Sequence, residues 1–219
     1  MTAKVGRLAV EAGVSLVGFA ELGGLADRPR AVVIAIRHSP EVLADPTNMP
    51  NPAYSDEYWR LNERLAEIAA AIATLLQQAG FRAYANAPTR HQIDPETLAT
   101  SFPHKTAATR AGLGWIGKSA LLVTPELGPA LRLNTVLTDA PIIAGMPVTA
   151  SECGDCSVCV ESCPARAITG AEWFPGRPRE ELLDAHACNS TCSERSRRIG
   201  IEGGRCGVCM AVCPRRPRN

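Results

Sequence analysis

Nine cysteines constrain this chain more than any other feature, because all of them lie in the last third of the sequence. The chain has 219 residues, and no cysteine precedes Cys153. A disulfide scaffold is more often a short secreted chain with an even number of cysteines. The distribution instead indicates an intracellular protein, one part of which is built around metal.

The strongest motif is Cys153-x2-Cys156-x2-Cys159-x3-Cys163-Pro164. This is the spacing of a bacterial ferredoxin loop, in which three thiolates bind one iron–sulfur cube and the fourth binds another cluster. The motif therefore predicts a [4Fe–4S] cluster at this loop.

A second, partial copy of the motif follows near the end of the sequence and lacks its first cysteine. It reads Cys206-x2-Cys209-x3-Cys213-Pro214. Either Cys188 or Cys192 would supply the missing ligand from upstream. Two [4Fe–4S] clusters need eight thiolates, and nine are present.

By the crossed pattern of ferredoxins, each cluster takes ligands from both copies of the motif. The first cluster would be held by Cys153, Cys156, Cys159 and Cys213. The second would be held by Cys163, Cys206, Cys209 and one of Cys188 or Cys192. The alternative is a pair of structural zinc sites, since paired Cys-x2-Cys motifs also suit zinc.

Composition separates this cysteine-rich part from the rest. From residue 164 onward there are ten arginines, no lysine and six acidic residues, although the net charge of the chain is only +1. Few large apolar residues occur there, so a bound group must replace much of the missing core. The basic tail, Arg215, Arg216 and Arg218, is expected to be solvated. The small net charge excludes a bulk polyanion binder.

The N-terminal part predicts an α/β fold, with domains at 1–148 and 149–219. Apolar residues at three- and four-residue steps indicate helices, and short apolar runs indicate strands. The expected helices are 3–13, 57–78 and 105–111; the expected strands are 14–20, 31–36, 81–87, 121–124 and 131–138; residues 38–55 are expected to form a loop. No signal peptide and no apolar run long enough for a membrane span are seen. We therefore expect a cytoplasmic protein without a membrane partner.

Residues 112–119, GLGWIGKS, match two nucleotide-binding patterns at once. Both patterns require a strand before the glycines and a helix after them. Here a helix-like stretch comes before and a strand-like stretch after, which argues against a phosphate loop. Two alternatives stay open: a tight turn between closely packed elements, and a turn whose bare backbone approaches a large flat cofactor.

Together, the run RAGLGWIGK at 110–118, the LTD at 137–139 and the double-cluster cysteine block resemble epoxyqueuosine reductases, a family that is similar to the core of reductive dehalogenases. The resemblance implies a nitroreductase-like N-terminal domain that binds base-off cobalamin, and a ferredoxin-like module whose two [4Fe–4S] clusters reduce the cobalt. Reduced cobalt is a strong nucleophile or electron donor, so the cofactor performs the difficult chemistry. The residues that the resemblance assigns to cofactor binding are Lys105, Arg110, Gly112, Gly114, Trp115, Gly117 and Lys118.

The sequence departs from the family in three respects. We expect no helical-repeat extension for tRNA, and Cys192 is an additional cysteine after the expected ligand Cys188. The loop at 100–105, TSFPHK, has no carboxylate where the family has an acid. His104 is therefore the candidate proton donor, since histidine transfers protons near neutral pH; the alternative is a surface histidine at a helix start. Tyr58 matches a tyrosine near the family's substrate pocket, where it would donate a proton or a hydrogen bond. The alternative is a packing role in an amphipathic helix.

Four functions compete. The first is a cobalamin-dependent reductase of a small or nucleoside-like substrate, fed by a ferredoxin or flavodoxin. The second is a non-catalytic electron-transfer protein, and the third is a reductive activator of a separate corrinoid protein. The fourth, a P-loop ATPase, would require ATP binding through Lys118. tRNA is not expected as a partner, and an exposed cluster edge would suit a homodimer or a redox partner.

Overall fold

The computed structural model describes residues 1–86 and 93–217 and is a mixed α/β fold of two compact units. The first unit comprises residues 1–37, 60–113 and 131–148, and the second comprises 38–59, 114–130 and 149–219. Both units therefore interleave along the chain. The expected division at residue 148 coincides with one of these boundaries, and the continuous domains 1–148 and 149–219 stay a prediction.

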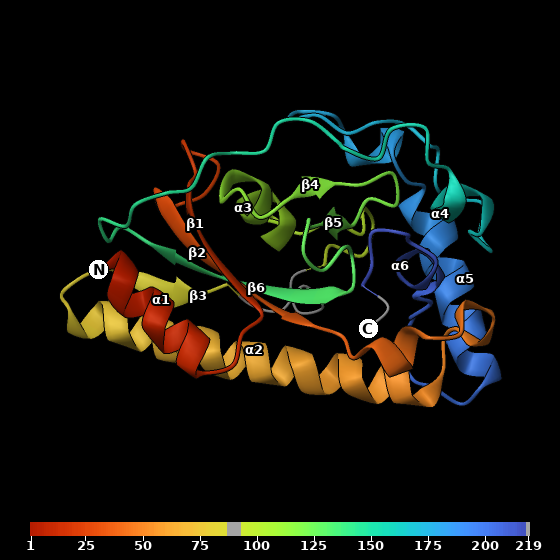
Figure 1. The fold of residues 1–219 in the computed structure, drawn as a ribbon, viewed down its shortest axis with the longest axis horizontal. Coiled ribbons are helices and arrows are strands. Elements are labelled where there is room, and N and C mark those ends of the chain that lie inside the picture. The colour runs from red at the N-terminus through yellow and green to blue at the C-terminus, as the bar shows by residue number, and fades with distance from the viewer. Residues whose placement is uncertain (87–92, 218–219) are drawn as a thin grey trace. The chain divides into compact units, whose positions relative to one another are not determined.

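The first unit is built on a four-stranded antiparallel sheet in the order β1-β2-β6-β3 (Figure 1). Its strands are β1 (Leu16–Glu21), β2 (Arg30–Arg37), β3 (Ala83–Ala85) and β6 (Leu131–Thr138). The apolar runs predicted β2 and β6 closely, because each strand contains a run of five consecutive buried residues. Residue 87, at the end of the strand expected at 81–87, lies outside the described residues.

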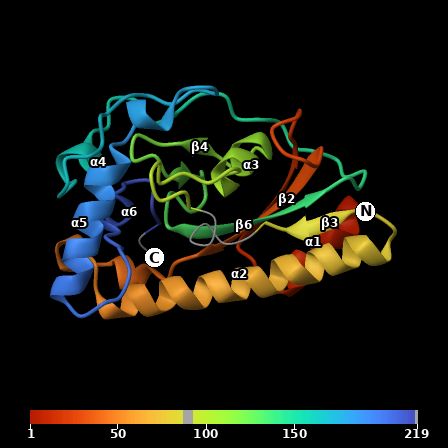
Figure 2. The ribbon, with the colours of Figure 1, turned by 180° about the vertical axis from the view of Figure 1, so that it is seen from behind.

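Helices cover both faces of this sheet (Figures 1 and 2). On one face, α1 (Thr2–Glu11) and the later turns of α2 (Pro52–Gln78) pack against Val32, Ile34 and Val136 in one apolar cluster. On the other face lies α3 (His104–Arg110): a Cβ at Gly18 would come within 2.9 Å of the Ala111 side chain. The unit is thus closed by its own apolar side chains.

The second unit consists of short elements joined by loops. They are η1 (Pro40–Leu43), η2 (Pro46–Asn48), the first turns of α2, β4 (Trp115–Ile116), β5 (Leu122–Val123), α4 (Val158–Glu161), η4 (Arg179–Glu181), α5 (Ala185–Arg198) and α6 (Val208–Ala211). Strands β4 and β5 form an antiparallel pair. Within residues 1–86 and 93–217, no helix is both long and apolar enough to cross a membrane.

Two expectations about residues 38–59 were wrong. Residues 38–55 are not a plain loop, because the prolines at 40 and 46 begin 3-10 turns. The long helix begins at Pro52 rather than residue 57, since proline is accepted in the first turn of a helix, where its missing N–H is not needed.

Candidate metal centre

The two copies of the cysteine motif have the same local structure in the second unit. Cys159 lies in α4 and Cys209 lies in α6, two four-residue helices that pack together. Each helix ends before a Cys-Pro pair, at Cys163 and Cys213. The sequence repeat is therefore also a structural repeat.

Four thiols, which we call the first thiol group, interact electrostatically with one another. They are Cys153, Cys156, Cys159 and Cys213. Burial raises the pKa of the Cys159 thiol to about 11, and the other three thiols of the group add to that rise. Burial likewise raises the pKa of Cys213, with the charges of Cys153 and Cys156 adding to it. Cys213, from the second motif, thus joins three thiols of the first.

Another four thiols, which we call the second thiol group, are linked by their electrostatic effect on Cys209 of α6. They are Cys163, Cys188, Cys206 and Cys209. Burial raises the pKa of Cys209, and charges at the other three, together with Cys159, raise it further. Cys192 is beside this group, with its Sγ 3.9 Å from the Sγ of Cys188.

Backbone N–H groups point at several of these sulfurs, as is typical of cluster ligands. Ala167 donates its N–H to the Sγ of Cys163 over 3.4 Å. Cys213 accepts from the N–H groups of Arg215 and Arg216. Nine free, half-buried cysteines, of which Cys163 and Cys213 accept backbone hydrogen bonds, fit the thiolate ligands that two iron–sulfur cubes require. Among the described residues, no three His, Cys, Asp or Glu side chains converge as ligands of a single metal ion.

Lys118 anchors the first cysteine loop. Its Nζ donates to the carbonyl oxygens of Gly154 at 2.5 Å and Cys156 at 3.2 Å, and lies 3.5 Å from a carboxylate oxygen of Glu172. The expected helix before this lysine and strand after it are both present, as α3 and β5. The structure therefore gives Lys118 partners in the cluster loop and reproduces the element order that argued against a phosphate loop.

The glycines of the same turn pack against protein. A Cβ at Gly114 would lie 2.0 Å from the Val123 carbonyl oxygen, and one at Gly117 would lie 2.8 Å from the Val123 side chain. A Cβ at Gly112 would lie 2.5 Å from the Met146 carbonyl oxygen. These close approaches account for glycine at the three positions through packing against protein.

Trp115 differs from these glycines, because one of its polar atoms is buried without a hydrogen-bond partner among the described residues. Its side chain is 1% exposed, and its indole N–H has no hydrogen-bond partner among the described residues. A buried donor without a partner costs about 1–3 kcal/mol, so a bound group that accepts this hydrogen bond would stabilise the unit. The guanidinium of Arg215 lies over the indole ring, 5.4 Å from its centre. Trp115 is the residue of the turn that best fits the expected contact with a cofactor.

The other expected site residues lie in the first unit or in α2. Arg110 donates from Nε to the Glu21 carbonyl oxygen, and Lys105 is half-buried in α3. His104 is 7% exposed, and its Nδ1 lies 3.0 Å from the Thr135 hydroxyl, so the alternative of a surface histidine was wrong. Tyr58 lies under the guanidinium of Arg205, 4.9 Å from its ring centre. The roles of these residues in catalysis or cofactor binding stay predictions.

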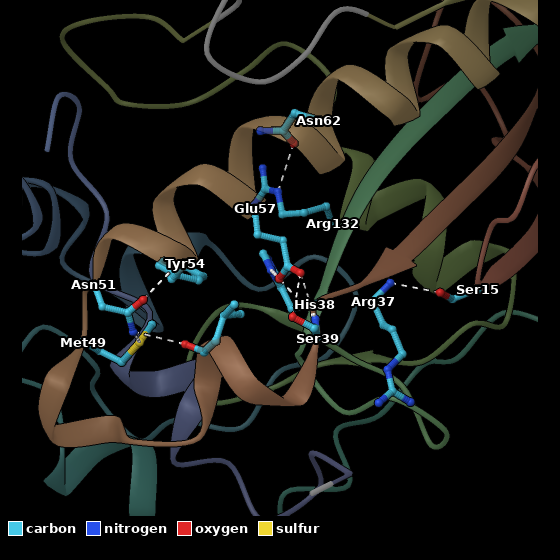
Figure 3. Close-up of polar contacts among 11 residues, drawn as sticks. Ser15, Arg37, His38, Ser39, Met49, Asn51, Tyr54, Glu57, Asn62 and Arg132 are labelled. Carbon is cyan, nitrogen blue, oxygen red and sulfur yellow. Dashed lines mark hydrogen bonds and ion pairs between the residues drawn. The ribbon is translucent and has the colours of Figure 1, made fainter. Parts of the chain in front are cut away.

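Sequence reasoning missed a buried ion pair in the second unit. The Nδ1 of His38 lies 2.8 Å from a carboxylate oxygen of Glu57, which also accepts hydrogen bonds from the N–H and hydroxyl of Ser39 (Figure 3). The His38 ring lies 5.3 Å from the ring of Tyr54. The only local signal was a charged residue on the apolar side of a helix, where it needs a partner.

Comparison with known proteins gives two kinds of sequence relative. A tetrachloroethene reductive dehalogenase of Sulfurospirillum multivorans is 34% identical over 114 residues, covering 49% of this chain and 22% of that protein. An epoxyqueuosine reductase of Pseudomonas aeruginosa is 28% identical over 177 residues, covering 80% and 46%. The chain is similar to epoxyqueuosine reductases and reductive dehalogenases. It spans less than half the length of either of these two relatives, and no family model matches it.

Solved structures of both kinds share the fold. A catabolic reductive dehalogenase matches 98% of this chain and 32% of its own, with a TM-score of 0.75 and 22% identity. An epoxyqueuosine reductase with a tRNA stem loop matches 97% of this chain and 64% of its own, with a TM-score of 0.63 and 18% identity. The resemblance read from the sequence is confirmed, and the α/β fold with it. The nitroreductase-like and ferredoxin-like descriptions of the two parts stay predictions.

Proposed function

We propose that the chain is the two-cluster core of an iron–sulfur reductase that passes electrons to cobalamin. The observation that carries the proposal is the grouping of the thiols, because Cys213 joins the first thiol group and Cys163 the second, as in two-cluster ferredoxins. The sequence relatives, which include epoxyqueuosine reductases and a reductive dehalogenase, support a reductase.

The chain's own residues would hold the clusters and bias their charge. Lys118 fixes the first cysteine loop through two carbonyl oxygens, and its ammonium group places a positive charge beside that loop. Arg215 holds the same loop by donating to the Glu152 carbonyl oxygen over 3.1 Å. Cations near an anionic cluster favour its reduction. An external ferredoxin or flavodoxin is the proposed electron donor.

The substrate is proposed as a small or nucleoside-like molecule. His104 is the proposed proton donor, because it is buried and its ring is oriented by Thr135. Tyr58 is retained as the second candidate. Residues 100–105 lack the family's acid, so epoxyqueuosine is not proposed as the substrate, and tRNA is not included among the proposed partners.

A non-catalytic electron carrier, or a reductive activator of a separate corrinoid protein, is the second candidate. The packing of Gly114 and Gly117 against Val123 favours it, because protein atoms fill the Cβ side of each glycine. In this case cobalamin would not bind to the chain itself.

Anaerobic reconstitution with iron and sulfide, followed by titration with cobalamin, tests the proposal. We expect about eight irons per chain and a base-off cobalamin spectrum, with Trp115→Phe weakening cobalamin binding. Eight irons without a cobalamin response would leave the second candidate. Bound zinc in place of iron would overturn both.

A further inference from the structure

His104 contacts the four-stranded sheet of the first unit through one of its two ring nitrogens. The residue begins α3, and its Nδ1 lies 3.0 Å from the hydroxyl oxygen of Thr135 in β6. Thr135 is fully buried, and His104 is 7% exposed. The contact is therefore shielded from water, where a hydrogen bond is electrostatically stronger than at the surface.

Asn86 holds the segment that leads into α3. Its backbone N–H, directly after β3, donates to the Thr135 carbonyl oxygen over 2.7 Å. Its side-chain amide donates over 3.1 Å to the carbonyl oxygen of Phe102, two residues before His104. Asn86 thus ties this segment to the position beside Thr135 on the sheet, so the backbone of His104 is held where its ring meets the hydroxyl.

The direction of the hydrogen bond between Thr135 and His104 follows from the hydroxyl's need for an acceptor. A threonine hydroxyl has one proton to donate, and a neutral imidazole has one N–H and one unprotonated nitrogen. Within residues 1–86 and 93–217, the Nδ1 of His104 is the one hydrogen-bond partner of the Thr135 hydroxyl. If Nδ1 carried the proton and donated it, the hydroxyl proton would be buried without an acceptor, which costs free energy. The hydroxyl therefore donates and Nδ1 accepts.

We propose that Thr135 is a positioning residue for His104: by donating to Nδ1, its hydroxyl keeps the proton of the neutral ring on Nε2. The nitrogen that carries the proton of a histidine is set by the hydrogen bond that the other nitrogen makes. The inference rests on the proposed function only for the use of that proton, because Nε2–H is then the group that His104 offers to a substrate. Thr135 acts through His104 and does not need to touch the substrate.

NMR of the ring nitrogens tests this assignment without cobalamin or substrate. The chain has four histidines, so the reconstituted full chain with isotope-labelled histidine gives few ring signals, and His104→Gln identifies those of residue 104. The spectra are recorded at a pH where the ring is neutral. We expect Nε2 to resonate as a protonated nitrogen and Nδ1 as an unprotonated nitrogen that accepts a hydrogen bond.

Two variants of Thr135 test whether its hydroxyl is the cause. Thr135→Val removes the hydroxyl and keeps a branched side chain, so the Nδ1 signal should move to the position of a nitrogen that accepts no hydrogen bond. Thr135→Ser keeps the hydroxyl and should retain the parent signal. Thr109→Val is the matched control, because Thr109 is a buried threonine of α3 whose hydroxyl donates to the Thr106 carbonyl oxygen. It should leave the His104 signals unchanged.

Two results would overturn the inference. One is a parent ring with its proton on Nδ1, and the other is a set of His104 signals that is the same in the parent and in Thr135→Val. If Thr135→Val does not fold, the parent tautomer and the signal of Thr135→Ser decide the question. Failure of the proposed function looks different, because the parent would then lack two clusters or a response to cobalamin while its His104 signals still report the tautomer.

Discussion

The two units differ in what stabilises them. In the first, α1, α2 and the sheet share an apolar cluster that includes Leu65, Ile72 and Val136, each fully buried. In the second, the corresponding cluster is smaller, and half-buried thiols and charged hydrogen bonds occupy much of the interior. Burial of apolar side chains therefore stabilises the first unit, whereas the second unit depends on the groups that its thiols bind.

Removing the clusters should produce the largest difference in stability between the two units. Stripping iron from the reconstituted protein with a chelator should lower amide protection in α5 and residues 206–217 by at least about 100-fold, because cluster-binding free energy contributes directly to folding. Amides of β2 and β6 should change little. Hydrogen exchange followed by mass spectrometry measures both. The control is a chelator already saturated with iron, and equal loss in both units would contradict the comparison.

Truncating a buried side chain of the first unit should have the opposite effect, destabilising that unit and leaving the clusters of the second unit in place. Ile72→Ala removes a fully buried side chain of the first unit and should destabilise that unit by about 2–5 kcal/mol. The iron content of the anaerobic protein should stay unchanged. Exchange of the β2 and β6 amides measures the effect. Val10→Ala, at a position 64% exposed, is the control and should have a much smaller effect.

Local pattern predicted the first unit better than the second, for a physical reason. The strands β2 and β6 and the helix α1 show their burial in their own periodicity. The spacing within each cysteine motif is also a local signal, and the role of these thiols as cluster ligands stays a prediction. The segments 38–59 and 114–130 join the second unit through contacts distant in sequence, so no local pattern predicted that interleaving, the pair of His38 with Glu57 or the partners of Lys118.

Lys118 donates to the first cysteine loop, so its substitution should affect the two clusters unequally. Lys118→Met removes a charged donor to two carbonyl oxygens of the first cysteine loop, and hydrogen bonds to charged groups contribute about 1.5–3 kcal/mol. We therefore expect the first cluster to be lost in air faster than in the parent, with the second cluster less affected. EPR and iron counts over time measure this loss. Lys118→Arg should restore part of it, and Lys4→Met, at an exposed position, should match the parent.

The pair of Glu57 with His38 makes part of the second unit sensitive to acid. Burial by itself would raise the pKa of Glu57, but hydrogen bonds from His38 and Ser39 outweigh it and lower the pKa below the ordinary value. An acid with a lowered pKa stabilises the folded state fully above its unfolded pKa, about 4.3 for glutamate. That stabilisation disappears as the pH falls through the lowered value.

Glu57→Gln should therefore have the smallest effect of the four changes, and the most dependent on pH. The amide keeps the shape and one acceptor but loses the charge, so we expect a cost of about 1 kcal/mol near neutral pH. The difference from the parent should shrink as the pH falls below about 4.3, because the parent then loses the same charge. Hydrogen exchange in α2 near residue 57, measured at several pH values, tests this, with the exposed Glu41→Gln as control. A difference that stays constant with pH would mean that packing of the carboxyl group, and not its charge, stabilises this part of the unit.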